Sequence, residues 1–192
     1  MAGPVFAAPF ERDLGEGLRL LRLREMPGDL PAGNAAAGPA VVDVRYATGD
    51  EAAATAFRAW LEFRAQRKTP VLLLVNAETA PAVLRALQER TQGRGLVVIG
   101  PATEAIRPDV PVTVAAEAEQ AAYRALADGA AVAAVLDSAP AKVRHDEASL
   151  NRGRDAEEAA APAVPAGPRP PVDAALQRAV HVHRTLAALR RL

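Results

Sequence analysis

The residues from Thr69 to Ala82, TPVLLLVNAETAPA, have the order of a buried strand, a tight turn and a helix. An apolar run ends at Asn76, Thr79 is suited to cap a helix, and the first helical turn tolerates a proline because its missing N–H has no intrahelical partner there. Such a junction holds a first-turn side chain where the helix N–H groups favour an oxyanion. That place suits the nucleophile of an acyl-transfer enzyme, and here it holds Pro81.

Other combinations of nucleophile and base are few. The serines and lysines of the chain are Ser138, Ser149, Lys68 and Lys142. Ser138, Lys142 and His145 lie close together in the segment LDSAPAKVRH. Pro140 interrupts any helix that would align them, and no glycine-rich oxyanion segment precedes them. We therefore interpret this stretch as a surface turn.

Two further groups lack the geometry of a site. His181 and His183 are two residues apart in a predicted helix, where they project about 200° apart and cannot share a metal ion. We expect them to be solvated or to take part in docking the helix. Gly93, Gly95 and Gly100 flank a strand without forming a phosphate loop, and we interpret them as turn glycines.

Carboxylates offer another kind of chemistry. Asp43 and Arg45 share one face of a predicted strand, and with Asp50 they can form a polar binding site at its carboxyl end. Such pairs more often fix strands and loops. Asp43, Asp50 or Glu78 can also act as acid and base if burial separates the pKa values of two of them. Their spacing gives no sign that any two meet, so we assign no catalytic, cofactor-binding or metal-binding residue.

Composition excludes several classes of protein. The 192 residues are enough for one domain with a real core, and the 23 lysines and arginines equal the 23 aspartates and glutamates. The balanced charge argues against nucleic-acid binding. Without cysteine there are no disulfides, thiolate metal sites or thiol nucleophiles. The first residues lack the pattern of a signal peptide, and no segment has the roughly 20 apolar residues of a membrane helix.

The elements that must position these residues alternate between strand and helix. We predict strands at 18–25, 41–46, 71–75, 96–99 and 110–114, and helices at 50–68, 79–91 and 116–128. In the first strand, leucines alternate in part with arginines, which fits one buried face. Phe57, Trp60, Leu61 and Arg64 have helical spacing. This order predicts a layered α/β domain with a mainly parallel sheet and right-handed crossovers.

The C-terminal third has a weaker pattern. Residues 131–136 fit either a strand or a helix, and residues 151–172 are rich in alanine, proline, glycine and charge, as a linker is. Helical periodicity returns from Asp173 to Leu192, and this helix must dock on its own domain or on a neighbouring subunit. We therefore divide the chain into an α/β domain at 14–138, a loop and linker at 139–171, and a docking helix at 172–192.

Five segments in this order resemble the tail-specific, or C-terminal processing, family of serine peptidases, which has the ClpP/crotonase type of fold. LRLLRLRE is similar to the family's Gly-Tyr-Ile-Arg-Ile strand and VVDVRYATGD to its Leu-Asp-Leu-Arg-Gly-Asn-x-Gly-Gly segment. VLLLVNAETAPAVLRAL resembles the elbow Val-Leu-Val-Asn-x-x-Thr-Ala-Ser-Ala-Ser-Glu. GLVVIGPAT resembles the following Gly-x-x-x-Thr strand, and RPDVPV the later Pro-Asp-Ile-x-Val. The similarity runs from about Gly17 to Val114, with a weaker one in the C-terminal segments.

The chain differs from the family at the positions of the catalytic residues. The family's nucleophilic serine falls at Pro81, and its second serine and glutamate fall at Val83 and Leu84. The activating lysine should follow Thr103, but the chain runs through four residues directly into Pro108. An arginine there cannot replace it as a base, because a guanidinium stays protonated.

We therefore expect a shortened, non-catalytic homologue of these peptidases that binds a peptide or protein or serves in assembly. The C-terminal helix, with arginines on its polar face, is the expected element for homo-oligomerisation. The resemblance implies a bacterial cell-envelope setting, and no nucleic acid, membrane insertion or cofactor is expected. The alternative is an active serine-type peptidase, or another hydrolase or lyase of this fold, with a rearranged site that uses carboxylates such as Asp43, Asp50 or Glu78.

Overall fold

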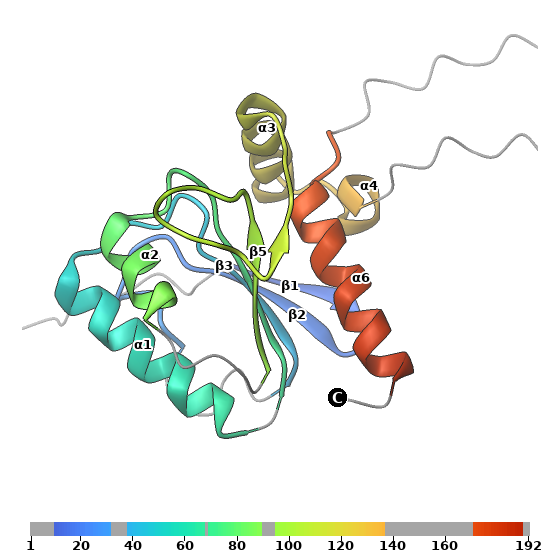
Figure 1. The fold of residues 1–192 in the computed structure, drawn as a ribbon. Coiled ribbons are helices and arrows are strands. Elements are labelled where there is room, and N and C mark those ends of the chain that lie inside the picture. Colours follow the sequence, from blue (N-terminus) through green and yellow to red (C-terminus); the bar gives the residue numbers. More distant parts are fainter. Residues whose placement is uncertain (1–9, 32–37, 68, 90–94, 137–170, 190–192) are drawn as a thin grey trace, which may run out of the picture. The chain divides into compact units, whose positions relative to one another are not determined.

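The computed structural model describes residues 10–31, 38–67, 69–89, 95–136 and 171–189 (Figure 1). The chain divides into two compact units. The first comprises Met1–Ala116 with Ala174–Leu192, and the second comprises Glu117–Asp173.

The first unit is built on a six-stranded sheet whose strands follow one another in chain order. These strands are β1 Phe10–Gly15, β2 Leu18–Arg22, β3 Ala40–Asp43, β4 Val71–Leu74, β5 Leu96–Gly100 and β6 Val110–Pro111. Strands β1 and β2 form an antiparallel hairpin, and every later pair is parallel. The predicted mainly parallel α/β architecture is confirmed. The strand β1 was not predicted, because its sequence, FERDLG, lacks an apolar alternation.

Helices cover both faces of this sheet. Helices α1 (Glu51–Ala65) and α2 (Pro81–Gln88) lie on one face, and α6 (Ala174–Ala188) lies on the other (Figure 1). When each new strand is added at the same edge of the sheet and every crossover has the same hand, the connecting helices lie on one face of the sheet. Helix α6 contacts β4 and β5. The C-terminal helix therefore docks on its own domain, which is one of the two possibilities that the sequence left open.

The covering of both faces corrects the expected pattern of β2. Both Leu20 and Leu21 are buried, although neighbouring residues of a strand point to opposite faces, and Arg22 is only 2% exposed. The strand is paired on both edges and has no solvent-facing side, as is usual inside a parallel sheet. The arginine at 22 thus faces the interior of the protein.

The core between the sheet and the two N-terminal helices is aliphatic with one buried ring. Val42, Leu73 and Val98 lie in register on three neighbouring strands and point to this side. Phe57 and Leu61 of α1 meet them in the same cluster. The side chain of Asp50 caps α1 by accepting a hydrogen bond from the Ala53 N–H (2.9 Å).

The last turn of helix α1 contains a buried arginine. The Arg64 side chain is 2% exposed, and its Nη2 donates to the Gly38 carbonyl (2.6 Å). Burial lowers the pKa of Arg64, and the charges of Arg19 and Arg67 lower it further. The guanidinium nevertheless remains a cation at physiological pH, and it ties the end of α1 to the segment that enters β3.

The glycines of this region differ in their roles. Gly95 has φ +84° at the entrance of β5, as expected for a turn glycine. Gly100 is different, because it is the last residue of β5 and a Cβ there would overlap the carbonyl oxygen of Val75. The interpretation of Gly100 as a turn glycine was wrong, since close approach of two strands requires it. Gly93 lies outside the described residues.

The far edge of the sheet is blunted by proline. The Val112 N–H donates to the Gly100 carbonyl (2.8 Å), so Val112 and Val110 turn their hydrogen-bonding groups toward β5. Pro111, which lies between them, faces away from β5 and has no N–H to offer to a further strand. This edge therefore resists the addition of another strand.

The second unit contains α3 (Ala116–Ala127) and α4 (Val132–Leu136). The ambiguous residues 131–136 thus form a short helix. Gly129, with φ +97°, ends α3, and the Ala130 N–H donates to the Ala125 carbonyl (2.9 Å). The Asp173 N–H donates to the Val135 carbonyl (2.8 Å) and closes the unit.

Candidate functional site

The junction between β4 and α2 has the predicted strand–turn–helix form. β4 is buried at every position, and the burial continues through Asn76, which is 4% exposed. The turn exposes Ala77 and Glu78 to solvent before α2 begins at Pro81. Pro81 is itself exposed at the start of the helix. The elbow therefore presents its first-turn residue at the carboxyl edge of the sheet, as the sequence predicted.

Thr79 does not cap the helix, contrary to the prediction. Its hydroxyl donates to the Val44 carbonyl (3.0 Å) and accepts from the Asn76 N–H (3.1 Å). The N-cap residue is Ala80, which makes no side-chain capping bond. Thr79 is 1% exposed and lies between the elbow and the end of β3. Its hydroxyl is thus engaged in joining two loops.

Asn76 also connects the loops that follow β3 and β4. Its Oδ1 accepts from the Glu78 N–H (3.1 Å), which forms an Asx turn, and from the Tyr46 N–H (3.4 Å). The Ala80 N–H also donates across the gap to the Ala47 carbonyl (3.0 Å). Tyr46 has φ +62°, a left-handed conformation that is uncommon outside glycine. The two loops at the ends of β3 and β4 therefore hold each other in one arrangement.

A buried charge cluster lies at the carboxyl end of β3. The Asp43 carboxylate binds Arg45 through two parallel hydrogen bonds, Nε to Oδ1 (2.9 Å) and Nη2 to Oδ2 (2.8 Å). The Arg45 N–H adds a third bond to Oδ1 (3.1 Å). Arg22 lies opposite Asp43 in register, with its Nε 3.4 Å from Oδ2. Two guanidinium groups therefore share one carboxylate.

The cluster is closed to solvent. The Asp43 and Arg45 side chains have no exposed surface, and that of Arg22 is 1% exposed. The Arg22 guanidinium also lies 4.6 Å from the centre of the Phe10 ring, which Arg12 approaches to 4.4 Å. Arginine side chains contact both carboxylate oxygens of Asp43, and the carboxylate is shielded from water. Asp43 is therefore suited to holding strands together and not to transferring protons to a substrate.

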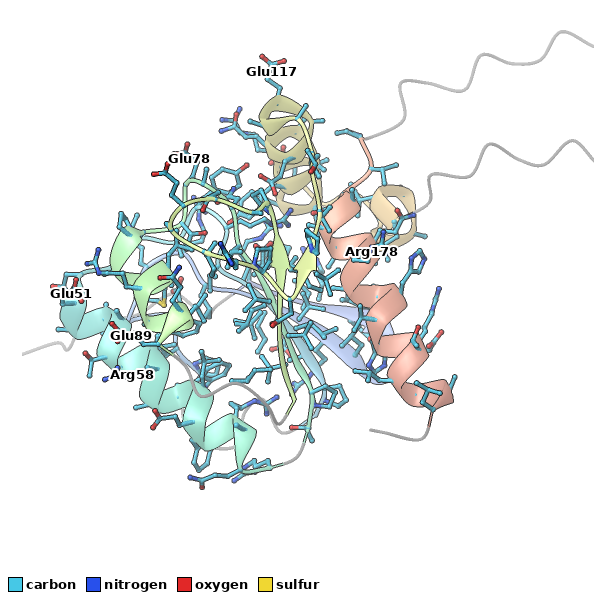
Figure 2. All side chains as sticks on the ribbon, viewed as in Figure 1. Glu51, Arg58, Glu78, Glu89, Glu117 and Arg178 are labelled. Carbon is cyan, nitrogen blue, oxygen red and sulfur yellow. The ribbon has the colours of Figure 1, made fainter. Side chains whose placement is uncertain are left out.

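The structure does not bring the candidate carboxylates together. Asp50 caps α1 and does not join the pair of Asp43 and Arg45. Glu78 projects outward from the elbow, as Figure 2 shows. Asp43 and Arg45 do pair, although β3 ends at Asp43 and Arg45 lies beyond the strand, and the predicted third member, Asp50, is not part of the pair. The three carboxylates therefore form no acid–base pair.

Sequence reasoning missed Arg22 and Asp109. Arg22 was placed on a polar face, although its position opposite an aspartate on the next strand is a signal for pairing. Asp109 accepts from the Val98 N–H through Oδ2 (2.7 Å), and so continues the β5–β6 pairing beyond Val110. An aspartate just before a short edge strand is suited to this role.

The loop after Thr103, where the resemblance would place a lysine, is a tight turn. The Thr103 N–H donates to the Ile106 carbonyl (3.0 Å), and the Ile106 N–H returns a bond to the Thr103 hydroxyl (3.2 Å). Ile106 is 1% exposed and belongs to the core between the sheet and α1 and α2. The turn leaves Glu104 and Arg107 exposed. It is thus anchored by an apolar side chain and contains no lysine.

Remaining candidates lie elsewhere. Ser138, Ser149, Lys142, His145 and Lys68 fall outside the described residues. On α6, His181 is exposed and His183 is buried, so the two do not share a ligand, as predicted. Among the residues that the structure describes, no three histidine, aspartate or glutamate side chains gather to hold a metal ion. No described helix is long and apolar enough to cross a membrane.

A small cavity lies between α1 and α2. Its volume is about 50 Å³, and its floor is formed by Ala54, Ala82 and Ala86. Ion pairs connect the helices at this cavity, Arg85 with Glu51 and Arg58 with Glu89. Figure 2 labels Glu51, Arg58 and Glu89. This space suits one or two water molecules and is far below the volume of an ordinary ligand pocket.

Comparisons with known proteins add no assignment. No protein-family profile matches the chain, and no curated protein matches it. The structural evidence for function therefore rests on the elbow and the cluster beside it.

Proposed function

We propose that this protein is a non-catalytic relative of the tail-specific processing peptidases that binds a polypeptide partner at the carboxyl edge of its sheet. The observation that carries the proposal is the elbow. Its backbone is held by Asn76 and Thr79, and it presents Pro81 to solvent at the first position of α2. A proline side chain has no group that can attack a carbonyl carbon. A strand–turn–helix elbow is thus combined with a residue that has no nucleophilic group.

The polar groups around the elbow support binding over chemistry. Asp43 is engaged by arginines, and Thr79 is engaged by two backbone groups. Glu78 is exposed and accessible to a partner, and it lies beside the half-buried Tyr46 loop. In open α/β sheets, ligands bind outside the carboxyl ends of the strands, where these loops lie. The proposed partner is a polypeptide because the resemblance is to enzymes that bind peptides.

Self-association through the C-terminal helix receives less support. The apolar side of α6 is packed within its own unit, with Leu176, Ala179 and Val180 buried. Of the helix's polar residues, Arg184 pairs with Glu16 (3.0 Å) and Arg178 is exposed (Figure 2). A homo-oligomer formed through α6 would have to use this polar side.

Two measurements test the proposal. The intact protein is first incubated with a fluorophosphonate probe and with fluorogenic peptides, and neither labelling nor turnover is expected. Unstructured peptides with free or amidated C-termini are then titrated by fluorescence polarisation. We expect binding that Glu78→Arg weakens about tenfold, since it reverses a charge beside the elbow. The control, Glu62→Arg, alters an exposed residue of α1 and should have no effect. Labelling of a serine would establish an enzyme, and no peptide binding would refute the binding role.

A further inference from the structure

His183 occupies an unusual position in the contact between α6 and the sheet. The side of α6 that is buried consists of Ala175, Leu176, Ala179, Val180 and His183. The imidazole is only 1% exposed. Its Nε2 lies 3.2 Å from the Glu16 carbonyl oxygen in the turn between β1 and β2. Since a carbonyl oxygen only accepts, we assign the proton of the neutral ring to Nε2.

Among the residues that the structure describes, none provides a hydrogen-bond partner for the second ring nitrogen of His183. Nδ1 is buried, and no hydrogen-bonding atom in the described part of the chain reaches it. In the neutral tautomer assigned above, Nδ1 is an acceptor. Burying this acceptor without a donor costs a modest amount of free energy. A proton on Nδ1 would add a buried donor without an acceptor, together with a buried positive charge.

The charged groups at this contact do not compensate such a charge. From the β1–β2 turn, Glu16 faces the helix, but its carboxylate is paired with Arg184 (Nε to Oε1, 3.0 Å). From α6 itself, Arg184 follows His183 in the chain and is paired with Glu16, and His181 is exposed. The β4 and β5 side chains on this face of the sheet are aliphatic: Leu72, Leu74, Val97 and Ile99.

We propose that protonation of His183 releases α6 from the sheet, so that docking of the C-terminal helix responds to mild acid. Undocking lets the imidazolium reach water, where both N–H groups are solvated, and it uncovers the aliphatic face of β4 and β5. A histidine is the side chain that changes charge in this range of pH. The inference goes beyond the proposed binding role and does not depend on it.

Amide hydrogen exchange on the full chain tests the proposal. Exchange of α6 and of α1 is compared at about pH 7.5 and about pH 5.5, which bracket the titration of an ordinary imidazole, after correction for the intrinsic rate. We expect the protection of α6 to fall about tenfold or more, and that of α1, on the opposite face, to stay the same. A parallel loss in both helices, or none in α6, would overturn the proposal.

Variants assign the effect to one residue. His183→Leu removes the titrating group, and His183→Gln retains an N–H donor for the Glu16 carbonyl, so at least one of them should keep α6 docked. In either folded variant, the protection of α6 should no longer depend on pH. The matched change His181→Gln, at the exposed histidine of the same helix, should behave as wild type. Persistence of the pH effect in a folded His183 variant would show that another group is responsible.

Discussion

Asp43 and Arg45 form a bidentate ion pair two residues apart in the chain, and neither side chain is exposed to solvent. The pair lies where β3 ends, and Arg22 approaches the same carboxylate from the neighbouring strand. Buried ion pairs hold charges that are costly to leave uncompensated. This cluster therefore connects the stability of the sheet to the loops that position the elbow.

Asp43→Asn should destabilise the protein strongly. The amide is nearly isosteric but neutral, so two buried guanidinium groups lose their shared carboxylate. We expect the free energy of unfolding to fall by about 3–5 kcal/mol. Urea denaturation followed by circular dichroism measures it, with Glu78→Gln, an exposed carboxylate, as the control that changes little. A loss below about 1 kcal/mol would show that the pair acts like a surface salt bridge.

Thr79→Val should destabilise the elbow without creating a cavity. The substitution keeps the shape of the side chain but removes the hydroxyl that joins the Asn76 N–H to the Val44 carbonyl. Leaving these buried groups unpaired should cost about 1–3 kcal/mol in the free energy of unfolding. Thr113→Val at an exposed position supplies the control. Equal stability of the two variants would argue that Thr79 contributes only by packing.

Gly100→Ala should be poorly tolerated. A Cβ at this position would overlap the Val75 carbonyl oxygen, which belongs to the backbone and cannot move independently. We expect a loss of about 1–3 kcal/mol or more in the free energy of unfolding, as for overpacked cores. Gly38→Ala is the matched control, because the nearest atom to its Cβ would be the Gly17 carbonyl oxygen at 3.9 Å. Thermal unfolding of both variants would reveal the difference.

Pro81→Ser should not create a peptidase. The serine would stand at the first position of α2, but Thr103 is followed by a tight turn with no lysine, and the neighbouring threonine hydroxyl is already engaged. A serine without a base remains a weak nucleophile. We expect no labelling by a fluorophosphonate and no cleavage of peptides. Measurable labelling at residue 81 would show that another group activates the elbow.

The order of strands and helices followed from local patterns. Apolar runs such as Val71–Val75 and the helical spacing of Phe57 and Leu61 predict their elements because burial selects side chains at periods near 2 and 3.6. The unsuitability of Pro81 for catalysis also needs no structure, since it depends on the chemistry of one residue. By the same logic β1, which is polar along most of its length, was missed.

Tertiary structure decided which polar groups meet. That Arg22 is buried against Asp43, and that Thr79 joins two loops instead of capping a helix, depends on strand register and on contacts 21 to 35 residues apart in the chain. The same holds for His183, whose partner Glu16 lies 167 residues away. The sequence by itself determined the alternation of elements and the presence of an inert proline at position 81, because these depend on single residues and their near neighbours. Only the fold decided the polar pairs. Buried polar groups are removed from water, so they form hydrogen bonds with residues that the fold brings close, even when these are distant in the chain.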